Sequence, residues 1–230
     1  MLPWKVIDAG PTREGRLELR QRGSRDFLIT IGGRVLMTST AHRSEDILAR
    51  VTCDTLAPIK KPHLLVGGLG MGLSLRAALD QLGTDAKVTV VDLDERVVTW
   101  CRGPLAELNR GALADARVSV AIADVAQVIA AANARTYHAI MLDLYEGPPR
   151  HDGRRPDRLY GPRAIENARR ALHPGGVLSV WSEDESPPFR ARLEGAGFTV
   201  RREHAGRGSR THVVYVAVAP ARGRTSKASY

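Results

Sequence analysis

The sequence predicts an α/β protein with a mostly parallel, seven-stranded sheet, helices on both faces, an antiparallel pair at the carboxyl-terminal edge, and a small β-rich lobe in front. Two observations predict this fold class. From residue 63 onward, apolar runs of strand length alternate with segments of helical periodicity, and such repeated units form parallel sheets that helices cover on both sides. Before residue 59 the apolar runs are short and β-like, with turn residues between them, which is typical of hairpins.

The amino-terminal lobe is expected to span residues 1–58. Strand patterns cover residues 4–7, 16–21, 27–31 and 34–38, and Gly32-Gly33 provides a hairpin turn between the last two. A helix is expected over residues 44–56, because Ile47, Leu48 and Val51 recur at helical spacing.

The second domain is expected to span residues 59–219. Its parallel strands are expected at residues 63–66, 87–91, 117–122, 138–142 and 177–181, with helices at 73–82, 95–102, 125–132 and 163–172. After a last helix near residues 188–194, β runs at 198–204 and 211–219 predict the antiparallel edge pair. Residues 220–230 are basic and contain little apolar material, so a disordered tail is expected.

A glycine-rich turn follows the first strand of the second domain. Gly67-Gly68-Leu69-Gly70-Met71-Gly72 lies where strand gives way to helix, and its glycines let the backbone pass close to a ligand. Dinucleotide-binding proteins need the spacing Gly-x-Gly-x-x-Gly, whereas the third glycine here comes one residue early. This spacing favours the turn of S-adenosylmethionine-binding enzymes over the NAD type.

Three successive strands each end in an aspartate, namely Asp92, Asp124 and Asp143. In an open α/β sheet these carboxyl ends meet at the edge where ligands bind. Asp92 would accept both ribose hydroxyls of a nucleoside. Asp124 would accept the adenine amino group, and it is equally suited to cap the next helix. The predicted cofactor-binding set is Gly68, Gly70, Gly72, Asp92, Leu93, Asp124, Val125 and Asp143.

On these residues the chain resembles the spermidine synthase (polyamine aminopropyltransferase) family, a branch of the class I methyltransferase-like superfamily with a Rossmann-like fold. The resemblance covers most of residues 16–182, and the amino-terminal lobe is similar to that family's small domain and gate helix. It is carried by the glycine turn with Leu75-Arg76, by Val91-Asp92-Leu93-Asp94, by Ile122-Ala123-Asp124, by Asp143-Leu144-Tyr145-Glu146 with Tyr160, and by Glu45-Asp46-Ile47-Leu48.

The resemblance implies a transferase of polyamine biosynthesis that alkylates a small-molecule amine. The donor would be decarboxylated S-adenosylmethionine or S-adenosylmethionine itself, and the product methylthioadenosine or S-adenosylhomocysteine. Asp143 matches the family's catalytic aspartate and would take the proton of the attacking amine, with Glu146 and Tyr160 as catalytic partners. The resemblance also implies a homodimer or a tetramer. The acceptor would lie among Glu45, Asp46, Met71, Glu146 and Tyr160.

The chain departs from the family's pattern, and two other functions stay open. Met71 stands where the family usually has the aspartate that holds the aminopropyl ammonium, and Glu146 stands where a second aspartate is usual. A methyltransferase that uses intact S-adenosylmethionine on a small molecule would not need the first of these. A regulatory protein without catalytic activity would need only the nucleoside pocket.

Composition narrows the class of protein further. The net charge of +9 comes from scattered arginines, which does not favour a nucleic-acid partner, because phosphate binding needs clustered cations. No apolar run approaches the roughly 18 residues of a membrane span, and the first residues lack the layout of a secretory signal. A cytoplasmic protein is therefore expected. Cys53 and Cys101 show no metal-ligand spacing, so no metal is expected.

Overall fold

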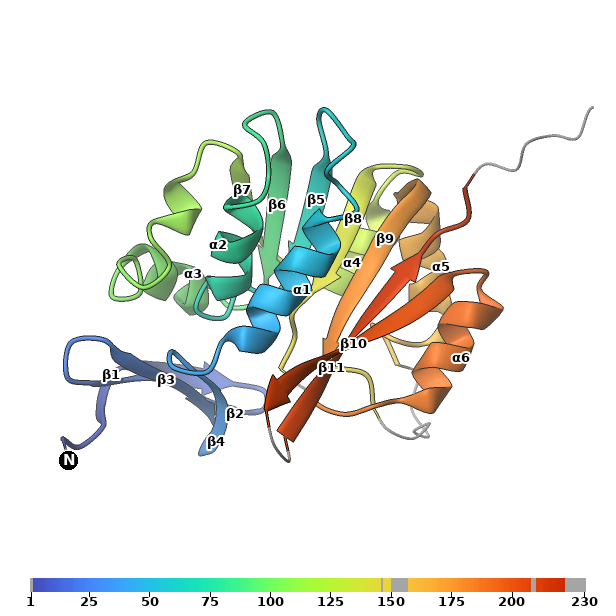
Figure 1. Ribbon diagram of the computed structural model, residues 1–230. Coiled ribbons are helices and arrows are strands. Elements are labelled where there is room, and N and C mark those ends of the chain that lie inside the picture. Colours follow the sequence, from blue (N-terminus) through green and yellow to red (C-terminus); the bar gives the residue numbers. More distant parts are fainter. Residues whose placement is uncertain (1, 146, 150–156, 208–209, 222–230) are drawn as a thin grey trace, which may run out of the picture.

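Two separate sheets organise the chain in the computed structural model, which describes residues 2–145, 147–149, 157–207 and 210–221 (Figure 1). The smaller sheet is antiparallel, and its order β1-β2-β3-β4 follows the sequence. Its strands are β1 (Lys5–Thr12), β2 (Gly15–Arg22), β3 (Asp26–Ile31) and β4 (Arg34–Thr38). The predicted hairpin turn forms at Gly32 and Gly33, whose φ angles of 53° and 81° lie in the region that glycine adopts without strain.

The larger sheet has seven strands in the order β10-β11-β9-β8-β5-β6-β7. Strands β5 to β9 pair in parallel, and β11 runs antiparallel to both of its neighbours, β9 and β10. The predicted fold class is therefore confirmed. The strands are β5 (His63–Gly67), β6 (Lys87–Asp92), β7 (Val118–Ile122), β8 (Tyr137–Leu142), β9 (Leu172–Ser182), β10 (Thr199–Arg207) and β11 (Arg210–Val218).

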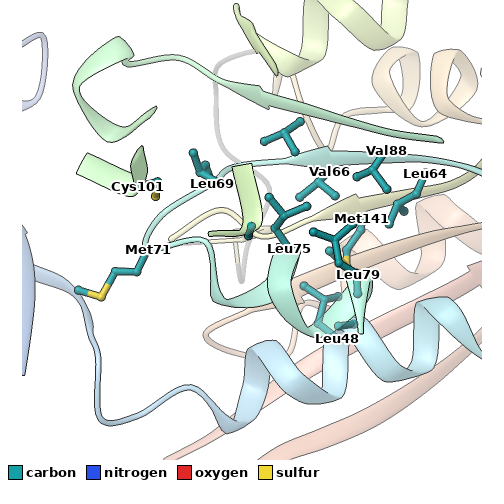
Figure 2. Packing of buried hydrophobic residues seen from close by; sticks show 14 of the residues in the cluster. Leu48, Leu64, Val66, Leu69, Met71, Leu75, Leu79, Val88, Cys101 and Met141 are labelled. Atoms are coloured by element: carbon teal, nitrogen blue, oxygen red, sulfur yellow. The ribbon is translucent and has the colours of Figure 1, made fainter. Parts of the chain in front are cut away.

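Helices cover both faces of this sheet. One face packs against α1 (Arg43–Cys53), α2 (Leu73–Leu79) and α3 (Glu95–Arg102), and the other against α4 (Val125–Ala131), α5 (Pro162–Ala171) and α6 (Pro187–Gly195). Successive strand residues point to opposite faces. Leu64 and Val66 of β5 accordingly join the first core cluster, whereas Leu65 joins the second. Figure 2 shows the first cluster, with Leu48 of α1 and Leu79 of α2 packed on the strands.

Some element boundaries differ from those expected. The helix expected over residues 73–82 ends at Leu79, and β9 begins at Leu172 rather than at residue 177. The segment His173-Pro174-Gly175-Gly176 has the composition of a loop. Pairing between Leu172 and Tyr137 nevertheless extends the strand back to the end of α5, with a register shift before Val177.

The small sheet lies beneath the carboxyl ends of the parallel strands (Figure 1). Two contacts attach β1 to α3: Trp100 donates from Nε1 to Asp8 Oδ2 at 2.6 Å, and Arg96 donates to the carbonyl oxygen of Pro11 at 2.9 Å. The edge at which parallel sheets bind ligands therefore faces a second structural unit. None of the described helices combines the length and the apolar character needed to cross a membrane.

Candidate functional site

The glycine turn approaches the loop after β8 closely. Gly68, Gly70 and Gly72 have φ angles of 87°, 52° and 79°. A Cβ atom on Gly68 would lie 2.3 Å from the carbonyl oxygen of Asp143, and one on Gly70 would lie 2.7 Å from Met37 Sδ of β4. The backbone of Asp143 leaves no room for a side chain at Gly68, and the positive φ at both positions favours glycine, so the turn can lie between β8 and the small sheet.

Asp92, at the end of β6, holds the glycine turn through its carboxylate. Its Oδ2 accepts the N–H of Leu69 at 2.8 Å and its Oδ1 accepts the N–H of Asp94 at 2.9 Å. Burial raises the pKa of this carboxyl above its usual value. Each oxygen has a second lone pair, so the carboxylate retains acceptor capacity for ligand hydroxyls.

Two apolar side chains are exposed beside this carboxylate. Leu93 follows Asp92 and is 75% exposed, and Ile122 pairs with Asp92 across the sheet and is 48% exposed. Asp124 caps α4 by accepting the N–H of Ala126 at 2.9 Å, as expected for the capping role. Val125 is buried and lies under Gly67. This arrangement suits a nucleoside: the Asp92 carboxylate can accept the hydroxyls of a sugar, and the exposed Leu93 and Ile122 can contact a flat, apolar ring.

Asp143 follows β8 directly and lies beside the glycine turn. Its N–H donates to the carbonyl oxygen of Gly67 at 2.8 Å, and its Oδ2 accepts a hydrogen bond from Ser74 Oγ. Burial raises the pKa of this carboxyl to about 7, and the nearby Glu45 carboxylate adds to the rise. A carboxylate with such a pKa can take up or release a proton near neutral pH.

The first turn of α1 brings Glu45 to this place but directs Asp46 elsewhere. Glu45 is only 7% exposed, and its Oε2 accepts a hydrogen bond from Ser44 Oγ at 2.6 Å. Asp46 is exposed and contacts His42 Nδ1 at 3.1 Å. Of the two α1 acids expected near the acceptor, Glu45 therefore joins Asp143 in a buried pair, and Asp46 does not.

A pocket of about 410 Å³ opens beyond the end of β9. Tyr160 lines it but is only 5% exposed, and its ring packs edge-on against Phe189 at 5.5 Å. Three acidic residues line the same pocket, which gives its wall a negative charge. The lining residues are Gly147, Pro148, Pro149, Asp157, Tyr160, Glu183 and Asp184.

Met71 does not join this group. The side chain of Met71 is fully buried in the core cluster, at 0% exposure, and extends toward the small sheet (Figure 2). It therefore presents no surface to an acceptor, since an apolar side chain is more stable packed than exposed. Glu146 lies outside the described residues.

The sequence did not identify Ser74 or Asp157 as site residues. Asp157 accepts the backbone N–H groups of Leu159 and Tyr160 at 3.0 and 2.8 Å, and so shapes the turn before α5. Ser74 carries its hydroxyl in the first helical turn after the glycines. This position in the sequence is the one signal that could have identified it. Within the described parts of the chain, no three His, Cys, Asp or Glu side chains gather as a metal site.

A glycine turn after one strand, acids at the ends of the neighbouring strands and apolar groups between them define a class of nucleoside-binding α/β proteins. The chain belongs to the spermine/spermidine synthase family, because the sequence model of the spermine/spermidine synthase domain matches residues 44–190. The family that the sequence resembles is therefore confirmed.

Several curated polyamine aminopropyltransferases are similar in sequence. The protein of Saccharolobus islandicus is 31% identical over 162 residues, which are 70% of this chain and 51% of the relative. That of Aeropyrum pernix is 33% identical over 119 residues, or 50% of this chain and 35% of the relative. That of Mycobacterium tuberculosis is 35% identical over 119 residues, which are 51% of this chain and 22% of the relative. The chain thus spans about half or less of these relatives.

Solved structures share the fold. The crystal structure of spermidine synthase from Thermotoga maritima superposes with a TM-score of 0.73 at 19% identity, over 94% of this chain and 74% of the other. A spermidine synthase in complex with the transition state analogue AdoDATO superposes with a TM-score of 0.73 at 18% identity, over 94% of this chain and 73% of the other. These matches confirm the Rossmann-like arrangement expected from the sequence.

Proposed function

We propose that the chain transfers an aminopropyl group from decarboxylated S-adenosylmethionine to a small amine. The observation that carries the proposal is Asp143, a carboxylate with a pKa of about 7 beside the glycine turn. The bound donor would supply a carbon that its neighbouring sulfonium already activates. The protein's own task is then to hold the nucleoside, align the amine and remove one proton.

The turn and the strand ends fit the nucleoside part of such a donor. Asp92 has acceptor capacity for hydroxyls, and Leu93 and Ile122 offer apolar surface beside it. A protonated amine cannot attack, because its lone pair is occupied. We assign Asp143 to accept that proton, so that the nitrogen forms its bond to carbon while the carbon–sulfur bond breaks and the electron pair stays on sulfur.

The acidic pocket beside Tyr160 supports a cationic acceptor. Asp157, Glu183 and Asp184 line it, and negative charge in a partly enclosed site attracts ammonium groups. Glu146, which has no described position, remains assigned to this side of the site by family resemblance alone. A diamine or a longer polyamine is the class of acceptor that such a wall suits.

Met71 favours one alternative. Because methionine is apolar and residues 67–72 include no Asp or Glu, the turn provides no carboxylate for the ammonium of an aminopropyl group. A methyltransferase that uses intact S-adenosylmethionine on a small amine would need no such group and would use the same nucleoside pocket and the same base.

Calorimetry with three ligands separates these functions. Decarboxylated S-adenosylmethionine should bind more tightly than S-adenosylmethionine, and methylthioadenosine should be released when a diamine is added. Tighter binding of intact S-adenosylmethionine, with methyl transfer to the amine, would establish the alternative. If none of the three ligands binds, the nucleoside site itself is refuted.

Replacing the base tests its assignment. Asp143→Asn should lower turnover by about 10²- to 10⁴-fold, the usual contribution of a general base, while methylthioadenosine binding stays within a few-fold. Turnover equal to that of the unaltered protein would remove Asp143 from the reaction.

A further inference from the structure

Ser74 is a buried side chain at the site to which the proposed function gives no task. It is the second residue of α2 and is 3% exposed. Its Oγ donates a hydrogen bond to Asp143 Oδ2 across 69 positions of sequence. The hydroxyl and the carboxylate meet because α2 begins where the glycine turn ends, beside the loop that carries Asp143.

The main chain of Asp143 is fixed independently of this bond. Its N–H donates to the carbonyl oxygen of Gly67 at 2.8 Å, and its own carbonyl oxygen is so close to Gly68 that a Cβ there would lie only 2.3 Å away. The side chain retains rotation about its own single bonds. The hydrogen bond from Ser74 restricts this rotation.

The hydrogen bond from Ser74 also makes the two carboxylate oxygens of Asp143 different from each other. Oδ2 is engaged by the hydroxyl, which leaves Oδ1 to receive a proton. Ser74 and Glu45 act in opposite directions on this group, since the hydroxyl stabilises the ionised carboxylate and the Glu45 charge opposes ionisation.

We propose that Ser74 is a positioning residue, whose hydroxyl orients the Asp143 carboxylate so that Oδ1 meets the ammonium group of the acceptor. The inference rests on the proposed function, because it assumes that Asp143 is the base. Ser74 itself touches no reacting atom.

Two variants test the role of Ser74. Ser74→Ala should lower kcat by about 10- to 100-fold, the usual cost of misplacing a reacting group, with the KM of the nucleoside donor within twofold. The acid limb of the kcat/KM profile should move to higher pH, because a hydrogen bond that lowers the pKa of Asp143 is lost. Ser74→Thr keeps the hydroxyl and should restore both.

Ser179 provides a matched control. It is 0% exposed on β9, and its Oγ has no hydrogen-bond partner in the part of the chain that the structure describes. Ser179→Ala removes a buried serine hydroxyl without touching Asp143, so kcat and the pH profile should stay as they are. An equal loss in Ser179→Ala and Ser74→Ala would overturn the proposal by showing a general effect of buried hydroxyls.

A measurement without substrate separates this inference from the proposed function. Carbon-detected NMR titration of Asp143 in the free protein should show a higher pKa in Ser74→Ala than in the unaltered protein and in Ser74→Thr. The same titration curve in all three overturns the inference, whatever the protein catalyses. If Asp143→Asn lowers turnover but Ser74→Ala does not, the function stands and the inference fails.

Discussion

At the residue scale, the site contains two buried carboxylates that lie close enough to act on each other. Asp143 and Glu45 come from different elements, and each has a serine hydroxyl as hydrogen-bond partner. Burial and a nearby like charge both oppose ionisation, so Asp143 retains its proton at a pH where exposed carboxyls have lost theirs. Burial is the larger cause of the raised pKa of Asp143, and Glu45 is the second.

Glu45→Gln should therefore lower the pKa of Asp143 from its value of about 7. Because the base must be ionised to accept a proton, the acid limb of the kcat/KM profile should move to lower pH. The pH dependence of turnover with a fixed diamine gives this directly. Asp46→Asn, one residue along the same helix but exposed, is the control and should leave the limb in place. A limb that stays in place in Glu45→Gln would show that Glu45 does not act on the base.

Among the described glycines with positive φ, Gly68 is the one whose added Cβ would lie nearest to another atom. Gly68→Ala places a methyl group 2.3 Å from the Asp143 carbonyl oxygen at a φ of 87°, so it adds a clash to backbone strain. The expected loss is at least about 2 kcal/mol of unfolding free energy, with weaker methylthioadenosine binding. Urea unfolding and calorimetry measure the two effects.

Gly33→Ala is the matched control for Gly68→Ala. Gly33 has a similar φ of 81° and nothing within 4 Å of the added carbon. It should show the strain alone, at about 1 kcal/mol, and leave ligand binding unchanged. Equal losses in both variants would mean that the close approach to β8 contributes nothing.

At the scale of elements, the regular pattern of the sequence predicts most of the fold. Alternating strand and helix patterns identify β5 to β8 and the helices between them, because each apolar run is bounded by polar or glycine residues. The start of β9 is missed, because Pro174 and Gly175 have the composition of a turn and only pairing with β8 makes them part of a strand. The sequence also predicts the aspartates at the strand ends, because each one directly follows an apolar run of strand length.

Buried polar residues in loops are the part of the site that the sequence does not reveal. Asn109 is 0% exposed, and its Nδ2 donates to the carbonyl oxygens of Cys101 and Met71 at 3.0 and 3.4 Å. Its Oδ1 accepts the N–H of Ala112 at 3.2 Å. The residue thus ties the glycine turn to the end of α3, yet a single asparagine between helices gives no pattern in the sequence.

Asn109→Leu should destabilise the protein, because a side chain of similar size leaves the carbonyl oxygens of Cys101 and Met71 buried without this donor. The N–H of Ala112 keeps its bond to the backbone carbonyl oxygen of Asn109 at 3.1 Å. Each carbonyl oxygen that loses its donor costs about 1–3 kcal/mol, and the turn should also bind methylthioadenosine less tightly. Asn133→Leu, at an exposed position, should change the unfolding free energy by no more than about 0.5 kcal/mol. Unfolding curves that coincide for the two variants would show that Asn109 does not hold the turn.

At the scale of the whole molecule, the small sheet is attached directly to the parts that carry the site. Tyr145, two residues after Asp143, donates its hydroxyl to Glu14 of the β1–β2 turn and accepts a hydrogen bond from Arg34 at 3.2 Å. The Arg34 guanidinium also lies 5.2 Å from the centre of the Tyr145 ring. The loop after β8 is therefore connected to the β1–β2 turn and to the first residue of β4.

The contact between β1 and α3 provides the last prediction. Trp100 is 1% exposed and donates to Asp8 at 2.6 Å, so Trp100→Phe keeps most of the packing and loses the hydrogen bond. We expect Trp100→Phe to lower the unfolding free energy by about 1–3 kcal/mol.

A double-mutant cycle with Asp8→Ala tests whether this loss comes from the hydrogen bond. The double variant should be more stable than the sum of the single losses predicts, by at least about 0.5 kcal/mol. Asp26→Ala, on β3 of the same sheet, replaces Asp8→Ala in the control cycle and should be additive with Trp100→Phe. If the Asp8 cycle is equally additive, the hydrogen bond contributes nothing to docking, and attachment of the small sheet then rests on its apolar packing and its other contacts.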